Sequence, residues 1–170
     1  MNHPMKNIRI EKLTLNVGAG KNQQVLEKGL KLIESIAGVP PVKTITQKRI
    51  QAWGLRPGLP IGCKITLRGE KAAELLPRLL AAKEKTLRSS QMGPGNVSFG
   101  IHEYIDVPGV NYDPDIGIMG FEVCVTLERP GYGVKRRRAH RAKVGNKHLI
   151  TKEDTVAYMK ETYQVQVDAS

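Results

Sequence analysis

The chain has 170 residues, and its 27 Lys and Arg outnumber its 16 Asp and Glu to give a formal net charge of +11. Because 40% of the residues are hydrophobic, a disordered basic tail is excluded. No apolar run reaches the ~20 residues of a membrane span, and the first residues lack the apolar stretch of a secretory signal. These figures predict a single soluble, cytoplasmic domain over residues 1–170 with a polyanionic partner. Nucleic acid fits that partner better than an anionic membrane surface.

Two kinds of periodicity predict the elements of the first half. Apolar and polar residues alternate with a period of two along the strand candidates, most clearly at Ile61, Cys63, Ile65 and Leu67. The helix candidate has apolar residues with helical spacing and stops at Gly38. In chain order we expect a strand at 8–17, a helix at 22–37, a short strand at 42–46, a turn-rich loop at 55–60 and a strand at 61–67.

The second half continues the same mixture. We expect a helical stretch at 70–87, a loop at 93–95, strands at 97–101 and 121–127, a loop at 108–120 between them, and a helix from about 151 to 163. Pro77 should kink the first of these helices or begin a second one. Thr151 and Asp154 resemble a capping box at the start of the last. The pattern predicts an α+β fold with a mainly antiparallel sheet and helices packed on one face.

Charge is segregated along the chain. Residues 35–69 carry six basic residues and no acid, and residues 134–148 carry seven basic residues and no acid. Residues 89–128 carry six acids and no Lys or Arg. A solvated surface normally mixes its signs, so these blocks favour separate faces for separate partners. Ordinary soluble loops are the alternative.

Candidate catalytic and ligand motifs fail on their spacing. The segment 18–21, Gly-Ala-Gly-Lys, lacks both the Walker spacing and the third glycine of a dinucleotide fingerprint. The four histidines show no metal-ligand spacing. Cys63 and Cys124 are interpreted as inward, buried core thiols. We therefore expect no catalysis, no metal and no cofactor.

The outward positions of two strands point to RNA. Lys12, Thr14 and Asn16 on one strand and Lys64, Thr66 and Arg68 on the other would form a polar, basic sheet face. Such residues contact phosphates, sugar hydroxyls and base edges. An ordinary solvated sheet face is the alternative. Neither strand offers an aromatic residue for base stacking, so a structured RNA read by backbone and shape is expected.

Further basic residues extend this surface. In the first basic block they are Lys43, Lys48 and Arg49; in the second, Arg136, Arg137 and Arg138 form part of an arm that neutralises phosphates. Trp53, in the same part of the chain, is predicted to pack in the core.

Two other functions are rivals to a specific RNA-binding scaffold: an RNA-acting enzyme and a free-standing RNA chaperone.

Two motifs carry a family resemblance. Residues 12–20, KLTLNVGAG, and 58–69, GLPIGCKITLRG, closely resemble family five of the large-subunit ribosomal proteins, which binds 5S ribosomal RNA. Residues 95–112 and the segment from Gly120 are similar to the same family. The resemblance covers residues 8–129 as a core. The basic arm and C-terminal helix of residues 130–170 are similar to the archaeal and eukaryotic branch.

The resemblance implies a role in the central protuberance, where the family attaches 5S rRNA beside 23S rRNA and other large-subunit proteins. Asn16 and Thr66 match family positions on the 5S-contacting face. The loop that matches 55–62 reaches P-site tRNA in the family, which implicates Arg56, Pro57, Gly58 and Leu59. The family also bridges to a small-subunit protein, and the acidic region 89–128 is the candidate for that side.

Overall fold

The computed structural model describes residues 3–168 and has a six-stranded antiparallel sheet at its centre. The helices are α1 (Gln23–Ala37), α2 (Glu70–Ala82) and α3 (Lys152–Tyr163). The strands are β1 (Arg9–Gly18), β2 (Val42–Ile45), β3 (Pro60–Leu67), β4 (Thr86–Arg88), β5 (Met92–Gly93), β6 (Asn96–Ile101), β7 (Phe121–Glu128) and β8 (Gln166–Asp168). The order in the large sheet is β2-β3-β1-β7-β6-β5, and β4 pairs with β8 in parallel. The predicted α+β class is confirmed.

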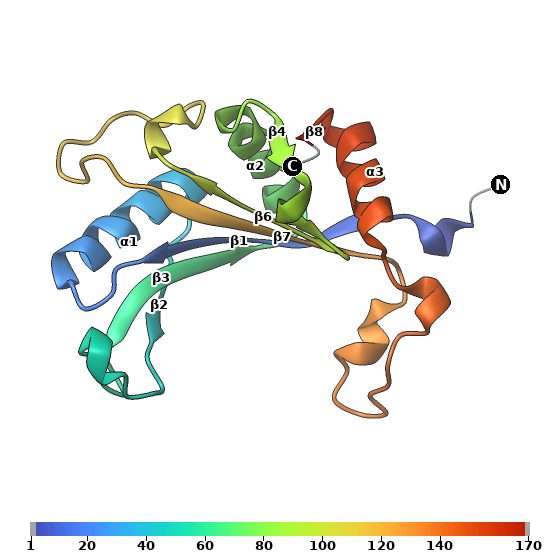
Figure 1. Ribbon diagram of the computed structural model, residues 1–170, viewed down its shortest axis with the longest axis horizontal. Helices are drawn as coiled ribbons and strands as arrows, with labels where there is room; N and C mark the ends of the chain where they lie inside the picture. Colours follow the sequence, from blue (N-terminus) through green and yellow to red (C-terminus); the bar gives the residue numbers. More distant parts are fainter. Residues whose placement is uncertain (1–2, 169–170) are drawn as a thin grey trace.

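Helices cover one face of the large sheet. In Figure 1, α1 and α2 lie above the strands and α3 lies to the right of α2, where it contacts β5. The covered face is apolar because every second residue of each central strand points toward the helices; Leu13, Leu15 and Val123 are completely buried there. The other face, which we call the open face, is the side away from α1 and α2. None of the helices in the described part of the chain has the length and apolar character needed to cross a bilayer.

The α2 helix is shorter than the predicted 70–87 stretch. It ends at Ala82, and Glu84 and Lys85 then adopt left-handed backbone angles with φ of 53° and 55°. Residues 86–88 become strand β4 because they pair with the C-terminal strand β8, a contact between distant segments that local periodicity cannot reveal. Pro77 lies exposed within α2, and no second helix begins there.

The two cysteines lie on opposite faces of the sheet. Cys63 is completely buried beneath α1, as predicted, and its burial raises the pKa of the thiol to about 11. The prediction for Cys124 is wrong, since it lies half-buried on the open face, paired with Thr14 of β1 and Ser98 of β6. The reason is parity: Val123 and Val125 point into the core, so the residue between them must point outward.

Candidate nucleic-acid interface

The predicted polar residues of β1 and β3 meet on the open face. In the antiparallel register Thr14 pairs directly with Thr66, and Asn16 pairs with Lys64. Lys12 lies two residues before Thr14 in β1, and Arg68 lies two residues after Thr66, just past the end of β3. Side chains of directly paired residues point to the same side of a sheet, so strand pairing brings the residues of two distant motifs into one surface.

The open face continues onto β7. Glu122 pairs with Asn16 in the ladder, and the Asn16 Nδ2 amide donates a hydrogen bond of 3.0 Å to Glu122 Oε2. This bond fixes the orientation of the Asn16 side chain and leaves its carbonyl oxygen free as an acceptor. Where the β1, β3 and β7 strands form the open face, the described side chains include no aromatic ring. The surface is therefore suited to hydrogen bonding and charge pairing, not to base stacking.

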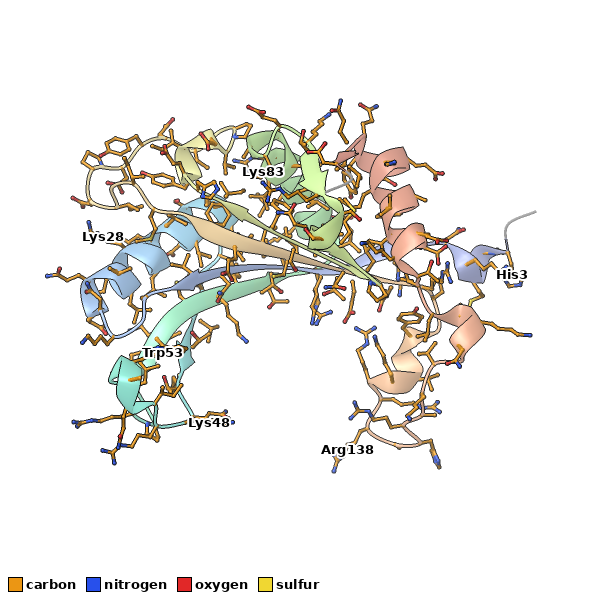
Figure 2. All side chains as sticks on the ribbon, viewed as in Figure 1. His3, Lys28, Lys48, Trp53, Lys83 and Arg138 are labelled. Carbon is orange, nitrogen blue, oxygen red and sulfur yellow. The ribbon has the colours of Figure 1, made fainter. Side chains whose placement is uncertain are left out.

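Two basic segments project on the same side as the open face. One is residues 46–59, which connect β2 and β3 and which we call the β2–β3 loop. The other is residues 129–150, which we call the basic arm. Figure 2 places Lys48 and Trp53 on the first projection and Arg138 on the second, both below the sheet, whereas Lys28 and Lys83 lie on the helical side. The two acid-free blocks of the sequence thus flank one face of the fold.

The β2–β3 loop is closed at its base by backbone hydrogen bonds. Thr46 N donates to Leu59 O and Gly58 N donates to Thr46 O, both at 2.9 Å. Gly58 has a φ of +86°, a left-handed conformation that a side chain would disfavour, and it forms part of this closure. Arg56 and Pro57, both exposed, directly precede this closure in the predicted tRNA-contacting segment.

The prediction that Trp53 packs in the core is wrong. Instead of packing in the core, its side chain is 67% exposed at the end of a short 3-10 turn, Gln51–Trp53. Leu55 fills the buried position of the loop, since its pairing with Ile50 turns it inward. The indole therefore lies at the surface of the β2–β3 loop, which also carries Lys48, Arg49 and Arg56 and contains no acid.

Lys43 is separate from the other predicted RNA-binding residues. It pairs with Cys63, whose side chain points toward the helices, so Lys43 points to the helical side at the sheet edge. Its neighbour Val42 pairs with Lys64 and therefore lies on the open face. Lys48 and Arg49 lie exposed in the β2–β3 loop.

The basic arm is tied to the body at its base. The Tyr132 hydroxyl donates to His148 O and accepts from Ile150 N, each at 3.0 Å. Arg129, which is 8% exposed, donates to Leu149 O and pairs with Asp154 at the start of α3. A hydrogen bond from the Thr151 backbone amide lowers the pKa of Asp154, and Arg129 lowers it further. These contacts confirm the predicted capping box and join the arm to α3.

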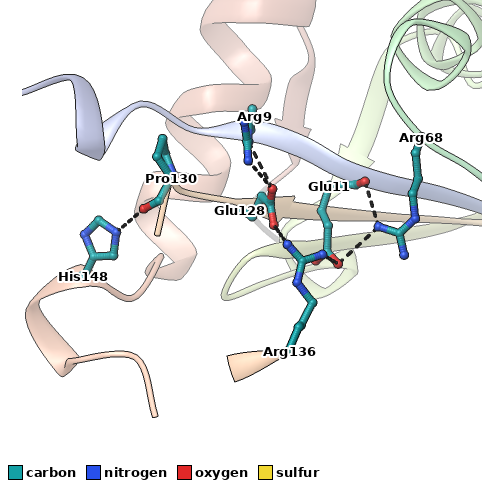
Figure 3. A network of polar contacts seen from close by, with 7 residues as sticks. All are labelled: Arg9, Glu11, Arg68, Glu128, Pro130, Arg136 and His148. Atoms are coloured by element: carbon teal, nitrogen blue, oxygen red, sulfur yellow. Dashed lines mark hydrogen bonds and ion pairs between the residues drawn. The ribbon is translucent and has the colours of Figure 1, made fainter. Parts of the chain in front are cut away.

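Three arginines and two glutamates connect the arm to the sheet (Figure 3). We call this cluster, made of Arg9, Glu11, Arg68, Glu128 and Arg136, the arginine junction. Arg136 reaches from the arm and donates to Glu11 Oε1 and to Glu128 Oε2, both at 2.6 Å. Arg9 donates to Glu128 Oε1 at 2.8 Å, and Arg68 lies 3.5 Å from Glu11 Oε1.

Three members of the junction, Arg9, Glu11 and Glu128, were not predicted from the sequence. The strand pattern changes parity at a β-bulge between Ile10 and Lys12, which puts both Glu11 and Lys12 on the open side. A break in alternation at Glu11 was the available signal. Of the other arm residues, Arg137 Nε donates to His140 O at 2.7 Å, and Arg138 has no hydrogen bond or ion pair to any residue within 3–168.

The acidic region 89–128 is divided among three places. Glu128 is buried in the arginine junction, and Glu122 lies on the open face. The other four acids, Glu103, Asp106, Asp113 and Asp115, lie in the β6–β7 loop, residues 102–120. In the same loop, Tyr112 is 55% exposed and Ile118 is 73% exposed.

Nearly the whole chain is similar to known proteins. A family model described as "Ribosomal protein L5" matches residues 3–56, and a second model, which describes the C-terminal part of the same ribosomal family, matches residues 60–158. The chain is 48% identical over 168 residues to large ribosomal subunit protein uL5 of Nanoarchaeum equitans, covering 98% of this chain and 99% of the relative.

Other archaeal relatives agree. Identity is 44% over 168 residues to uL5 of Methanococcus maripaludis, covering 96% and 93% of the two chains. It is 42% over 167 residues to uL5 of Sulfurisphaera tokodaii, covering 97% and 94%. The fold, the motifs on the open face and these full-length similarities lead to one conclusion: the chain belongs to the ribosomal protein L5 (uL5) family, whose members are non-enzymatic structural components of the large ribosomal subunit.

Proposed function

We propose that this protein binds 5S rRNA through the open face and helps attach it in the central protuberance of cytoplasmic large ribosomal subunits. The observation that carries the proposal is the joint position of Thr14, Asn16, Lys64 and Thr66, which strand pairing brings onto one uncovered surface between two basic projections. The basic arm would contact 5S or 23S rRNA beside that surface, and neighbouring large-subunit proteins would complete the attachment.

The proposed mechanism is scaffolding. Hydroxyl and amide groups on a rigid sheet can meet 2′-hydroxyls and base edges, while Lys64 and Arg68 neutralise phosphates. Because the strands fix the spacing of these groups, an RNA of the matching shape binds without ordering the protein surface first. This favours one folded RNA over many, and it distinguishes the proposal from a free-standing RNA chaperone.

Replacing Asn16 or Thr66 with alanine is expected to weaken 5S rRNA binding by about 1–3 kcal/mol, since each change leaves an RNA group without its hydrogen-bond partner. The dissociation constant for the organism's own 5S rRNA at physiological salt is the measurement. Asn111→Ala and Thr162→Ala are matched controls, because both residues are exposed away from the open face. Unchanged affinity in both test variants would move the RNA site elsewhere.

Two further readouts sharpen this test. Bound 5S rRNA should slow alkylation of Cys124, which lies half-buried on the open face, whereas buried Cys63 should react slowly with or without RNA. Competition by an unrelated structured RNA distinguishes the proposal from a free-standing RNA chaperone, which should bind 5S rRNA and the competitor with equal affinity. Turnover of a nucleotide or RNA substrate would favour the other rival function, an RNA-acting enzyme.

The β2–β3 loop is proposed to contact P-site tRNA, and the β6–β7 loop to contribute to a bridge with a small-subunit protein. The first is supported by the exposed Arg56 and Trp53 in an acid-free loop. The second is supported by the four acids and exposed apolar side chains of residues 102–120, which suit a basic protein partner better than RNA.

Each loop supplies the control for the other. In assembled ribosomes Arg56→Ala is expected to raise the dissociation rate of P-site tRNA roughly fivefold, as loss of about 1 kcal/mol would, and to leave 5S binding and subunit association unchanged. Glu103→Gln with Asp106→Asn should weaken subunit association and leave tRNA binding unchanged. Loss of 5S binding in Arg56→Ala, or the same defect in both variants, would contradict the proposed division.

A further inference from the structure

The arginine junction combines buried acids with exposed bases. The Glu11 and Glu128 side chains are only 7% and 6% exposed. The Arg9, Arg68 and Arg136 side chains that contact them are 64%, 55% and 42% exposed. A partner that approaches this part of the open face therefore meets guanidinium groups, although the cluster as a whole has a formal charge of only +1.

The two glutamates bring together three arginines that come from three different segments. Arg9 comes from the start of β1, Arg68 follows β3, and Arg136 comes from the basic arm. Arg136 contacts both carboxylates, one with each terminal nitrogen. The β-bulge of β1 turns Glu11 to the open side and so creates half of this arrangement.

The arginines retain donors after these contacts. A guanidinium has five N–H donors, so Arg9 and Arg136, with two engaged each, keep three. We infer that the arginine junction is a preformed phosphate-binding site for rRNA in which Glu11 and Glu128 act as positioning residues, a conclusion that rests on the proposed RNA-binding function. Its ligand would be backbone phosphates of an RNA lying along the open face toward the basic arm.

Phosphate is favoured over an acidic protein because of what surrounds the junction. Lys12 adjoins it on β1, and the arm beyond Arg136 continues with Arg137 and Arg138 and contains no acid up to His148. A series of cations without an intervening acid is suited to the closely spaced negative charges of a nucleic-acid backbone. The planar guanidinium also matches a phosphate with two parallel hydrogen bonds.

A positioning role for the two glutamates and a simple effect of their charge predict opposite changes in RNA affinity when the glutamates are removed. Removing an acid beside a polyanion site should tighten binding if only net charge counts. If the acids hold the arginines, their removal frees three long side chains, whose conformational freedom is then lost on binding. The variant with less negative charge should then bind RNA more weakly.

The test is the double variant Glu11→Gln/Glu128→Gln, measured with the organism's own 5S rRNA over a series of salt concentrations. We expect affinity at least fivefold weaker than wild type and a smaller salt dependence, because phosphate contacts are lost although two negative charges are removed. Glu70→Gln/Glu74→Gln, on the exposed surface of α2, removes the same charge from the helical side and should bind as wild type or slightly more tightly.

Arg136→Lys provides a second variant that does not depend on the buried positions. It keeps the charge but cannot join Glu11 to Glu128, so it should also weaken binding at least threefold, with unchanged circular dichroism. Wild-type or tighter RNA binding by both the double glutamine variant and Arg136→Lys would overturn the positioning role. The same result is expected if the junction binds an acidic protein and not RNA. Failure of the wild-type chain to bind 5S rRNA would instead overturn the proposed function itself.

Discussion

Replacing Arg138, Arg141 and Lys143 of the basic arm with glutamine is expected to weaken rRNA binding by about 10²–10³-fold near 0.1 M salt. Each phosphate contact contributes ~0.7–0.9 to the slope of log affinity against log salt, so three contacts lower that slope by roughly 2–3. The three side chains are exposed, and none has a hydrogen bond or ion pair to another residue in the described range 3–168. Their cations are therefore available to an RNA partner.

The measurement is a salt titration of affinity for 5S rRNA and, separately, for 23S rRNA. The RNA whose slope falls is the one that the arm contacts. Lys71→Gln/Lys85→Gln/Lys160→Gln is the matched control, since it removes the same charge from exposed lysines on or beside α2 and α3, on the helical side. Equal losses in the two triple variants would mean that net charge alone, and not the arm, determines affinity.

Leu15→Ala is expected to destabilise the protein by about 2–5 kcal/mol, the usual cost of removing a large buried aliphatic side chain and leaving a cavity. Leu15 is completely buried at the centre of β1 and pairs with Ile65 of β3 and Val123 of β7. Its side chain lies between the sheet and the helices that cover it, so few neighbours can move to fill the space. Urea unfolding followed by circular dichroism gives the free energy.

Val42→Ala is the control for this substitution. Val42 is an apolar strand residue like Leu15, but it is 65% exposed on the edge strand β2. Its loss should cost less than about 0.5 kcal/mol, as for most surface substitutions. Below its unfolding transition Leu15→Ala should still bind 5S rRNA with near wild-type affinity, because no side chain of the open face has changed. Similar stabilities for the two variants would place Leu15 outside the core.

The proposed interface depends on how three segments are joined. The open face supplies hydrogen-bonding groups, the basic arm supplies exposed charge, and the arginine junction links them through Arg136. Because Arg129 and Tyr132 also tie the arm to residues 148–154, its base is held at both ends. The triple arm variant and the double glutamate variant of the junction therefore separate charge from position. The first removes cations, whereas the second keeps every cation but removes the carboxylates that hold the arginines.

Alternation along β1 and β3 was sufficient to predict which of their side chains point away from the core. With a period of two, burying Leu13 and Leu15 obliges Thr14 and Asn16 to point the other way, whatever the rest of the fold. The same rule places Cys124 outward between Val123 and Val125, so the inward prediction failed because it relied on the usual burial of cysteine and not on the pattern.

Other features depend on contacts between residues far apart in the chain. Residues 86–88 are a strand only because the C-terminus pairs with them, and Trp53 is exposed because Leu55 occupies the buried site of its loop. Glu11 and Glu128 became the centre of a cluster through a β-bulge and an arm that folds back more than a hundred residues later. The side chains that share a face of each strand can be read from the amino-acid order, because backbone geometry is local. Which faces meet and which charges pair could be seen only in the folded chain, because those contacts depend on how distant segments pack.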